Sequence, residues 1–155
     1  MGGQAPVTSF DLDRNLAVAG PISGQFRDLA QKFWDQPHIP ADLIELVRLD
    51  LAQMHRAEGE TKLRHPKAAG LSEAKVKAVL DANWHRDPQF SASEKAVLNF
   101  AEYYFVDPES IPDDAAAAVV THFSDSGLVC LVEALGFIDS RIRLAIIYSN
   151  FAQEA

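Results

Sequence analysis

Residues 43–53 read LIELVRLDLAQ, and the twelve residues after them, 54–65, read MHRAEGETKLRH. The apolar residues of the first stretch cover more than one side of a helix, which predicts a helix that is buried over most of its circumference. The second stretch carries two histidines, two glutamates and three basic residues. A polar segment of this kind between apolar helices indicates either a solvated helix junction or an active-site segment.

Helical periodicity continues along most of the chain, and no segment alternates as a β-strand would. Ser91 and Glu94 form a capping box ahead of the apolar run KAVLNF. The helices are expected to begin near Gln25, Pro40, Glu60, Ser72, Ser91, Asp113 and Ser124. The pattern predicts one all-α domain over residues 1–155, a bundle of about six to seven helices. Residues 1–22 show no sustained period and are expected to form an irregular N-terminal arm.

The overall charge and the single cysteine limit the possible functions. The formal net charge is −8 with a pI near 5, so we expect no nucleic-acid partner, because phosphate binding needs a basic face. The chain has one cysteine, Cys130, which fits a reducing cytoplasm. The long apolar segment from residue 124 contains Glu133, Asp139 and two arginines, which make membrane insertion costly. We therefore expect a cytoplasmic protein that does not enter a membrane.

The order of these segments resembles a known family. LIELVRLDLAQ, a short polar stretch, KAAGLSEAKV and the segment 90–145 follow one another, with caps at Ser72, Ser91 and Ser124 and the pattern HFSD…LV at 122–129. This arrangement resembles the carboxymuconolactone decarboxylase superfamily, in particular its alkylhydroperoxidase D-like branch, over roughly residues 24–147. The resemblance implies an all-helical subunit that assembles as a homotrimer or homohexamer. Surplus apolar surface on the helices at 43–54 and 128–147 agrees with such assembly.

The resemblance also locates a candidate site. Peroxidase members of that branch carry a glutamate in an E-L-V-x-L helix, followed by a C-x-x-C-x-x-x-H motif. Glu45 matches the glutamate, whereas Ala57 and Glu60 stand at the cysteine positions and Arg64, followed by His65, stands at the histidine position. Thiol peroxidases need a thiolate nucleophile and a resolving thiol. We therefore expect no peroxidase activity by the family mechanism.

Three functions remain open at this stage. The first is an alkylhydroperoxidase D-like protein without redox cysteines, whose activity is non-redox or lost. The second is a 4-carboxymuconolactone decarboxylase or a related acid/base lyase or isomerase of aromatic degradation. The third is a non-catalytic oligomeric module that binds a partner or a small ligand.

For a catalytic function, the candidate residues are Glu45 and Glu60 as acid or base, His65 as proton carrier and Arg64 for a small anionic substrate. Glu45 should be buried and paired with Arg64 or His65, or failing these with Arg56. The alternative places Glu45 outward in a solvated i, i+3 pair with Arg48. We expect no cofactor and no metal, because the set His55, Glu58, Glu60 and His65 spans a glycine break that fixes no ligand geometry.

Overall fold

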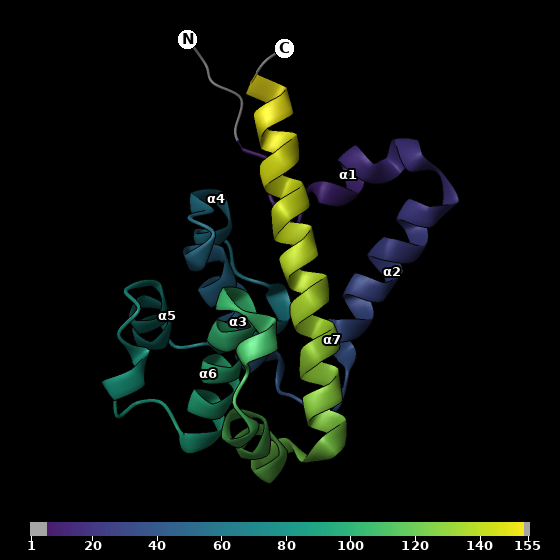
Figure 1. Cartoon of the computed structure of the whole chain (residues 1–155). Coiled ribbons are helices and arrows are strands. Elements are labelled where there is room, and N and C mark those ends of the chain that lie inside the picture. The colour runs from purple at the N-terminus through teal and green to yellow at the C-terminus, as the bar shows by residue number, and fades with distance from the viewer. Residues whose placement is uncertain (1–5, 154–155) are drawn as a thin grey trace.

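The structure, a computed structural model, describes residues 6–153, and all regular structure in this range is helical (Figure 1). The elements in chain order, with η for a 3-10 helix, are α1 (Leu12–Leu16), η1 (Ala17–Ala19), α2 (Pro21–Asp35), α3 (Ala41–Met54), α4 (Glu58–Thr61), η2 (Pro66–Ala68), α5 (Glu73–Leu80), η3 (Trp84–Arg86), α6 (Ala92–Val106), η4 (Pro108–Ser110) and α7 (Asp113–Gln153). The all-α prediction is confirmed, and the seven α-helices within the described range agree with the number expected.

The centre of the fold is α3, which contacts α5, α6 and α7 (Figure 1). Every residue from Leu43 to Ala52 is buried, which confirms the prediction of a helix covered on most sides. This run includes three charged residues, Glu45, Arg48 and Asp50. Because burying a charge is costly without a partner, these three side chains require a structural explanation.

The predicted irregular arm is wrong for most of its described part. Residues 12–16 form α1, residues 17–19 form η1, and α2 begins at Pro21 rather than at Gln25. A five-residue helix is too short to produce a periodic apolar pattern, and its one fully buried residue, Leu12, holds it against the body. Residues 1–5 of the expected arm lie outside the described range.

Backbone geometry explains why α3 ends at Met54. Arg56 adopts a left-handed conformation with φ 58°, and the Ala57 N–H donates to the Ala52 carbonyl oxygen at 2.9 Å. This closure is the usual way in which a helix C-terminus satisfies its last carbonyl groups. The helix expected to begin near Glu60 is divided into α4 and η2, because His65 is extended before Pro66.

The long helix α7 contains a sharp break at Ser124, where φ is 65° and ψ is 175°. The helix start predicted near Ser124 agrees with this break, since a new helical direction starts there. Gly127 permits the close turn: a Cβ atom at this position would lie 2.4 Å from the Cβ atom of Phe123. Figure 1 shows the short first part of α7 below the fold and the long second part crossing its whole height.

Residues 113–151 of α7 are long and apolar enough to cross a membrane by length and composition, with a mean hydropathy of 1.5 over the best 18-residue window. Core helices of other proteins pass the same test. Within this helix, Asp139 pairs with His55 and with Arg143, and Arg141 pairs with Asp13. These pairs are better suited to packing within a protein than to contact with lipid.

Candidate functional site

Glu45 is completely buried, and its carboxylate is bound by the guanidinium of Arg48 on the same helix. Arg48 Nε donates to Glu45 Oε2 at 2.8 Å, and Nη2 donates to Oε1 at 2.7 Å. The backbone N–H of His65 donates to Oε1 at 3.1 Å. The predicted burial of Glu45 is therefore correct, whereas the predicted partners Arg64, His65 and Arg56 are wrong as side chains.

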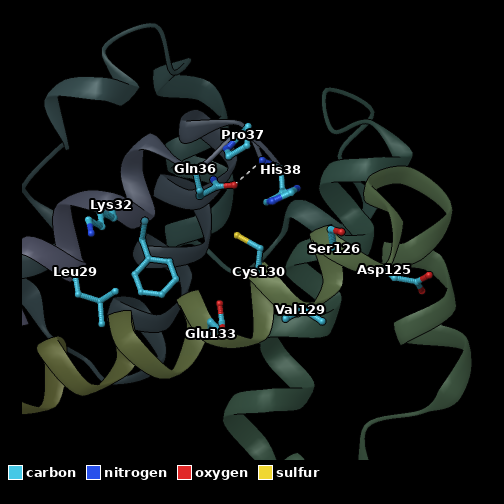
Figure 2. Close-up of a pocket in the computed structure, with 11 residues that line it drawn as sticks. Leu29, Lys32, Gln36, Pro37, His38, Asp125, Ser126, Val129, Cys130 and Glu133 are labelled. Carbon is cyan, nitrogen blue, oxygen red and sulfur yellow. Dashed lines mark hydrogen bonds between the residues drawn. The ribbon is translucent and has the colours of Figure 1, made fainter.

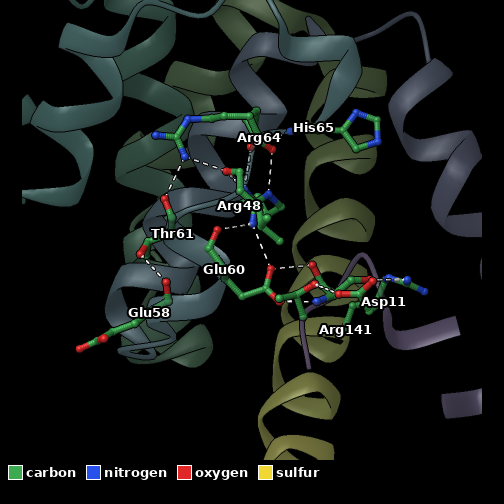
Figure 3. A network of polar contacts seen from close by, with 12 residues as sticks. Asp11, Arg48, Glu58, Glu60, Thr61, Arg64, His65 and Arg141 are labelled. Atoms are coloured by element: carbon green, nitrogen blue, oxygen red, sulfur yellow. Dashed lines mark hydrogen bonds and ion pairs between the residues drawn. The ribbon is translucent and has the colours of Figure 1, made fainter. Parts of the chain in front are cut away.

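Glu60, on α4, binds the same guanidinium from the other side (Figure 3). Arg48 Nη1 donates to Glu60 Oε2 at 3.1 Å and to the Glu60 carbonyl oxygen at 3.2 Å. Ser9, from the N-terminal segment, donates to the Glu60 carboxylate through its backbone N–H and through its hydroxyl, the latter at 2.7 Å. Glu60 is 2% exposed, so it is a structural acceptor enclosed between α3 and the N-terminal segment.

All five N–H groups of Arg48 are engaged. Two bind Glu45, two bind Glu60, and the last donates to the Leu63 carbonyl oxygen at 3.0 Å. Charge-assisted and bidentate hydrogen bonds of this kind are the strongest in proteins. The arginine has no donor left for a substrate, and both carboxylates are occupied as acceptors of its hydrogen bonds.

A second buried arginine extends this group toward α7. Arg141 donates from Nη2 to the Ser9 carbonyl oxygen at 2.6 Å, and it binds both oxygens of Asp13 at 3.1 and 3.3 Å. We call the set Ser9, Asp13, Glu45, Arg48, Glu60 and Arg141 the Arg48 network. It joins α1, α3, α4 and α7 and contains three acidic and two basic side chains.

Arg64 and His65 take different positions. Arg64 turns away from Glu45, donates to the carbonyl oxygens of Thr61 and Leu63 at 2.9 and 2.7 Å, and lies 3.7 Å from a Glu73 carboxylate oxygen. Figure 3 shows its guanidinium directed to the opposite side from the His65 ring. The structure therefore does not bring the four predicted site residues together around one point.

The His65 ring stacks on Trp34 of α2, with centroids 3.6 Å apart and an angle of 2° between the planes. Burial lowers the pKa of His65, and the charge of Arg48 lowers it further, whereas Glu45 acts in the opposite direction. Its Nδ1 accepts a hydrogen bond from the Lys67 backbone N–H at 3.2 Å. The lowered pKa favours the neutral ring, and a neutral ring that accepts a hydrogen bond at Nδ1 carries its proton on Nε2.

A cavity of about 170 Å³ opens beside this ring, between α1, α2 and α7. We call it the His65 cavity. Its walls include the aromatic groups of Phe10, Trp34, His65 and Phe137 and the arginines Arg27 and Arg141. Arg48 also lines this cavity, with its guanidinium carbon 4.9 Å from the centre of the Phe10 ring.

Sequence reasoning missed Ser9, Asp13, Trp34 and Arg141 as members of this region. Their sequence neighbourhoods carry no motif, and Ser9 and Glu60 are 51 residues apart. As a partner of Glu45, Arg48 was considered only in the exposed alternative. The one available signal was its position three residues after Glu45 on a helix that was expected to be buried.

The only cysteine lies in a different place. Cys130 lines a cavity of about 560 Å³ between α2 and α7, and its sulfur points into that space (Figure 2). Burial raises the pKa of the Cys130 thiol, and the charge of Glu133 raises it further. Its position on α7, away from the Arg48 network, agrees with the expectation that it does not replace a redox pair.

Metal ligands are not grouped within residues 6–153: no three His, Cys, Asp or Glu side chains lie close enough to hold an ion. The set considered from the sequence is divided among separate contacts. His55 Nε2 pairs with Asp139 at 2.5 Å, Glu60 belongs to the Arg48 network, and His65 stacks on Trp34.

No family model and no curated protein matches this chain. One solved structure is similar, the crystal structure of a protein of unknown function from Agrobacterium tumefaciens that is described as a candidate antioxidant defence protein AhpD. The two sequences are 23% identical, the match covers 86% of this chain and 92% of that one, and the TM-score is 0.70. This similarity establishes the alkylhydroperoxidase D-like all-α fold of the chain.

Proposed function

We propose that this chain is an alkylhydroperoxidase D-like protein that has no thiol peroxidase activity and binds a small molecule in the His65 cavity. The observation that supports this most directly is the saturation of Arg48 by Glu45 and Glu60. The positions that the resemblance assigns to two cysteines hold Ala57 and Glu60, and Glu60 is committed to Arg48 and Ser9. What remains accessible is a neutral histidine beside an aromatic cavity.

Thiol peroxidase activity is expected to be absent. With an organic hydroperoxide and a dithiol reductant, the rate should equal that of the reductant alone, because Cys130 is the only thiol and its pKa is raised by burial. Coupled oxidation of the reductant is the measurement. Cys130→Ser is the matched control, and turnover that disappears in this variant would show that the proposal is wrong.

Acid/base lyase activity is a second candidate, favoured by the position of His65 next to Arg27 and Arg141 in one cavity. A decarboxylase needs a proton carrier and cations that hold carboxylates. In this candidate His65 carries the proton, and Glu45 positions it through the His65 backbone N–H.

For this second candidate, His65→Gln should abolish carbon dioxide release from 4-carboxymuconolactone, whereas Arg64→Gln should change it little, because Arg64 points away. The thermal stability of both variants would be measured beside the rate. Release that survives His65→Gln, or that the wild type never shows, would exclude the lyase function.

Self-association remains part of the proposal. No residue of α2 is fully buried, and Ile22, Leu29, Val129, Val132 and Ile147 are exposed. Exposed apolar groups on neighbouring helices favour burial against further copies of the chain, as a trimer or hexamer. We likewise propose a cytoplasmic location with no nucleic-acid or membrane partner.

A further inference from the structure

We infer that the His65 cavity binds a small carboxylate that carries a single planar ring. This inference rests on the proposed small-molecule function of that cavity, and it adds the chemical class of the ligand. Three properties of the cavity support it: its size, the shape of its walls and its hydrogen-bonding groups.

The size of the cavity limits the ligand to about one ring. Its volume is about 170 Å³, and an apolar cavity of about 150 Å³ engineered into another protein binds benzene. One six-membered ring therefore fills the space, whereas a nucleotide or any molecule with two fused rings exceeds it. A substituent on the ring would extend toward the open side.

The walls favour a flat ring. Trp34 and His65 lie parallel to each other at one side. The Phe10 ring meets the same histidine at 5.7 Å, and the Phe137 ring packs 5.3 Å from Phe33. Aromatic rings prefer offset-stacked or edge-to-face neighbours, so a flat aromatic ring is the ligand shape that suits a cavity lined by several aromatic side chains.

The hydrogen-bonding groups favour an anion. In Arg141, the Nε–H and one N–H of Nη1 have no acceptor within residues 6–153. Among the described residues, Arg27 pairs only with its exposed neighbour Asp28, and such pairs contribute little. His65 offers a third donor at Nε2. The cavity wall contains one acidic residue, Asp13, which is already bound to Arg141.

A carboxylate held by Arg27 and Arg141 would gain charge-assisted hydrogen bonds that a neutral ligand lacks. A charged small molecule without a ring would leave the aromatic walls uncovered. The ring and the carboxylate therefore both contribute to the affinity at this position.

Calorimetric titration of the full chain with benzoate tests the inference, with benzamide and acetate as comparison ligands. Benzoate should bind at least about tenfold more tightly than benzamide, because only the carboxylate gains charge-assisted hydrogen bonds. It should also bind at least about tenfold more tightly than acetate, because only the ring covers the aromatic walls. Quenching of tryptophan fluorescence should accompany binding, because Trp34 lines the cavity.

Two variants on α2 locate the site. Arg27→Gln should weaken benzoate binding about tenfold and leave benzamide unchanged, because it removes a charged hydrogen bond. Lys32→Gln is the matched control: this lysine lies on the same helix but lines the Cys130 cavity, and its replacement should leave the benzoate affinity unchanged. Both side chains are exposed, so neither replacement should impair folding.

Each alternative result has a definite meaning. Equal binding of benzoate and benzamide would overturn the carboxylate assignment and leave the cavity a small-molecule site. Equal binding of benzoate and acetate would overturn the assignment of a ring to the ligand. Benzoate binding that responds to Lys32→Gln and not to Arg27→Gln would overturn the inference. The inference would also be overturned if none of the three ligands bound. The absence of peroxidase activity is decided by the separate dithiol assay.

Discussion

Replacing Arg48 with methionine should lower the free energy of unfolding by about 3–5 kcal/mol, the effect of removing one partner from a buried ion pair. Arg48 is 2% exposed, and the carboxylates of Glu45 and Glu60 lie against it with side-chain exposures of 0% and 3%. Without the guanidinium, two buried negative charges face each other with no cation between them. Denaturant unfolding of the wild type and the variant measures the difference.

Two further variants separate the charge from the shape of the side chain. Arg48→Lys keeps the positive charge but cannot reproduce the five directed N–H bonds, so we expect an intermediate loss of stability. Glu45→Gln combined with Arg48→Met removes one of the two unpaired buried charges. It should therefore recover part of the lost free energy of unfolding. A change below about 1 kcal/mol for Arg48→Met would mean that water or movement of α4 compensates, which contradicts a closed network.

Asp50 should make the protein less stable as the pH rises from about 4 to about 8. Asp50 lies on α3, is 1% exposed, and its Oδ2 has no hydrogen-bond partner within residues 6–153. Burial raises its pKa from an ordinary value of 3.8 to about 8, and the charge of Glu102 raises it further. The folded protein therefore keeps a proton on this carboxyl at neutral pH, whereas the unfolded chain has lost it.

The direction of the effect follows from proton linkage. Between pH 3.8 and about 8 the folded state binds one more proton at Asp50 than the unfolded state does, so this contribution to stability declines as pH rises. It is fully present below pH 3.8 and lost above about 8. A tenfold change in proton affinity is worth about 1.4 kcal/mol, so the total is on the order of 5 kcal/mol.

Asp50→Asn isolates this contribution, because the amide is neutral at every pH. The variant should be about as stable as the wild type near pH 4 and more stable by several kcal/mol near pH 8. Asp28→Asn, at an exposed position, is the matched control and should follow the wild type at both pH values. If Asp50→Asn and the wild type lost stability in parallel across this range, Asp50 would be ionised in the folded protein.

Local sequence information was sufficient for most of the helices. The apolar run LIELVRLDLAQ predicted a helix buried on most sides, and α3 is buried from Leu43 to Ala52. Ser91 and Glu94 predicted a capping box, and both of its hydrogen bonds are present at 3.2 and 2.9 Å. These features depend on residues within one or two helical turns of each other, so a single stretch of sequence contains the information they require.

The short elements were harder to predict, since their conformation depends on what they contact. Nothing in residues 12–16 forms a long apolar stripe, yet they are helical because Leu12 is buried against the body. The Arg48 network shows the same limitation. Helical spacing made Arg48 a neighbour of Glu45, but it could not show that α4 and the N-terminal segment cover the pair.

The sequence by itself determined the all-α class, the central buried helix, the capping box of Ser91 and Glu94, and the absence of cysteines at the two positions where the resemblance places them. Only the tertiary structure decided that Glu45 pairs with Arg48, that Glu60 is enclosed by Ser9, and that His65 stacks on Trp34. The physical reason is that helix formation depends on neighbours along the chain, whereas the state of a charged side chain depends on which distant segments exclude water from it. Ser9 and Arg141 meet across 132 positions, and no periodicity in the sequence specifies a contact over that distance.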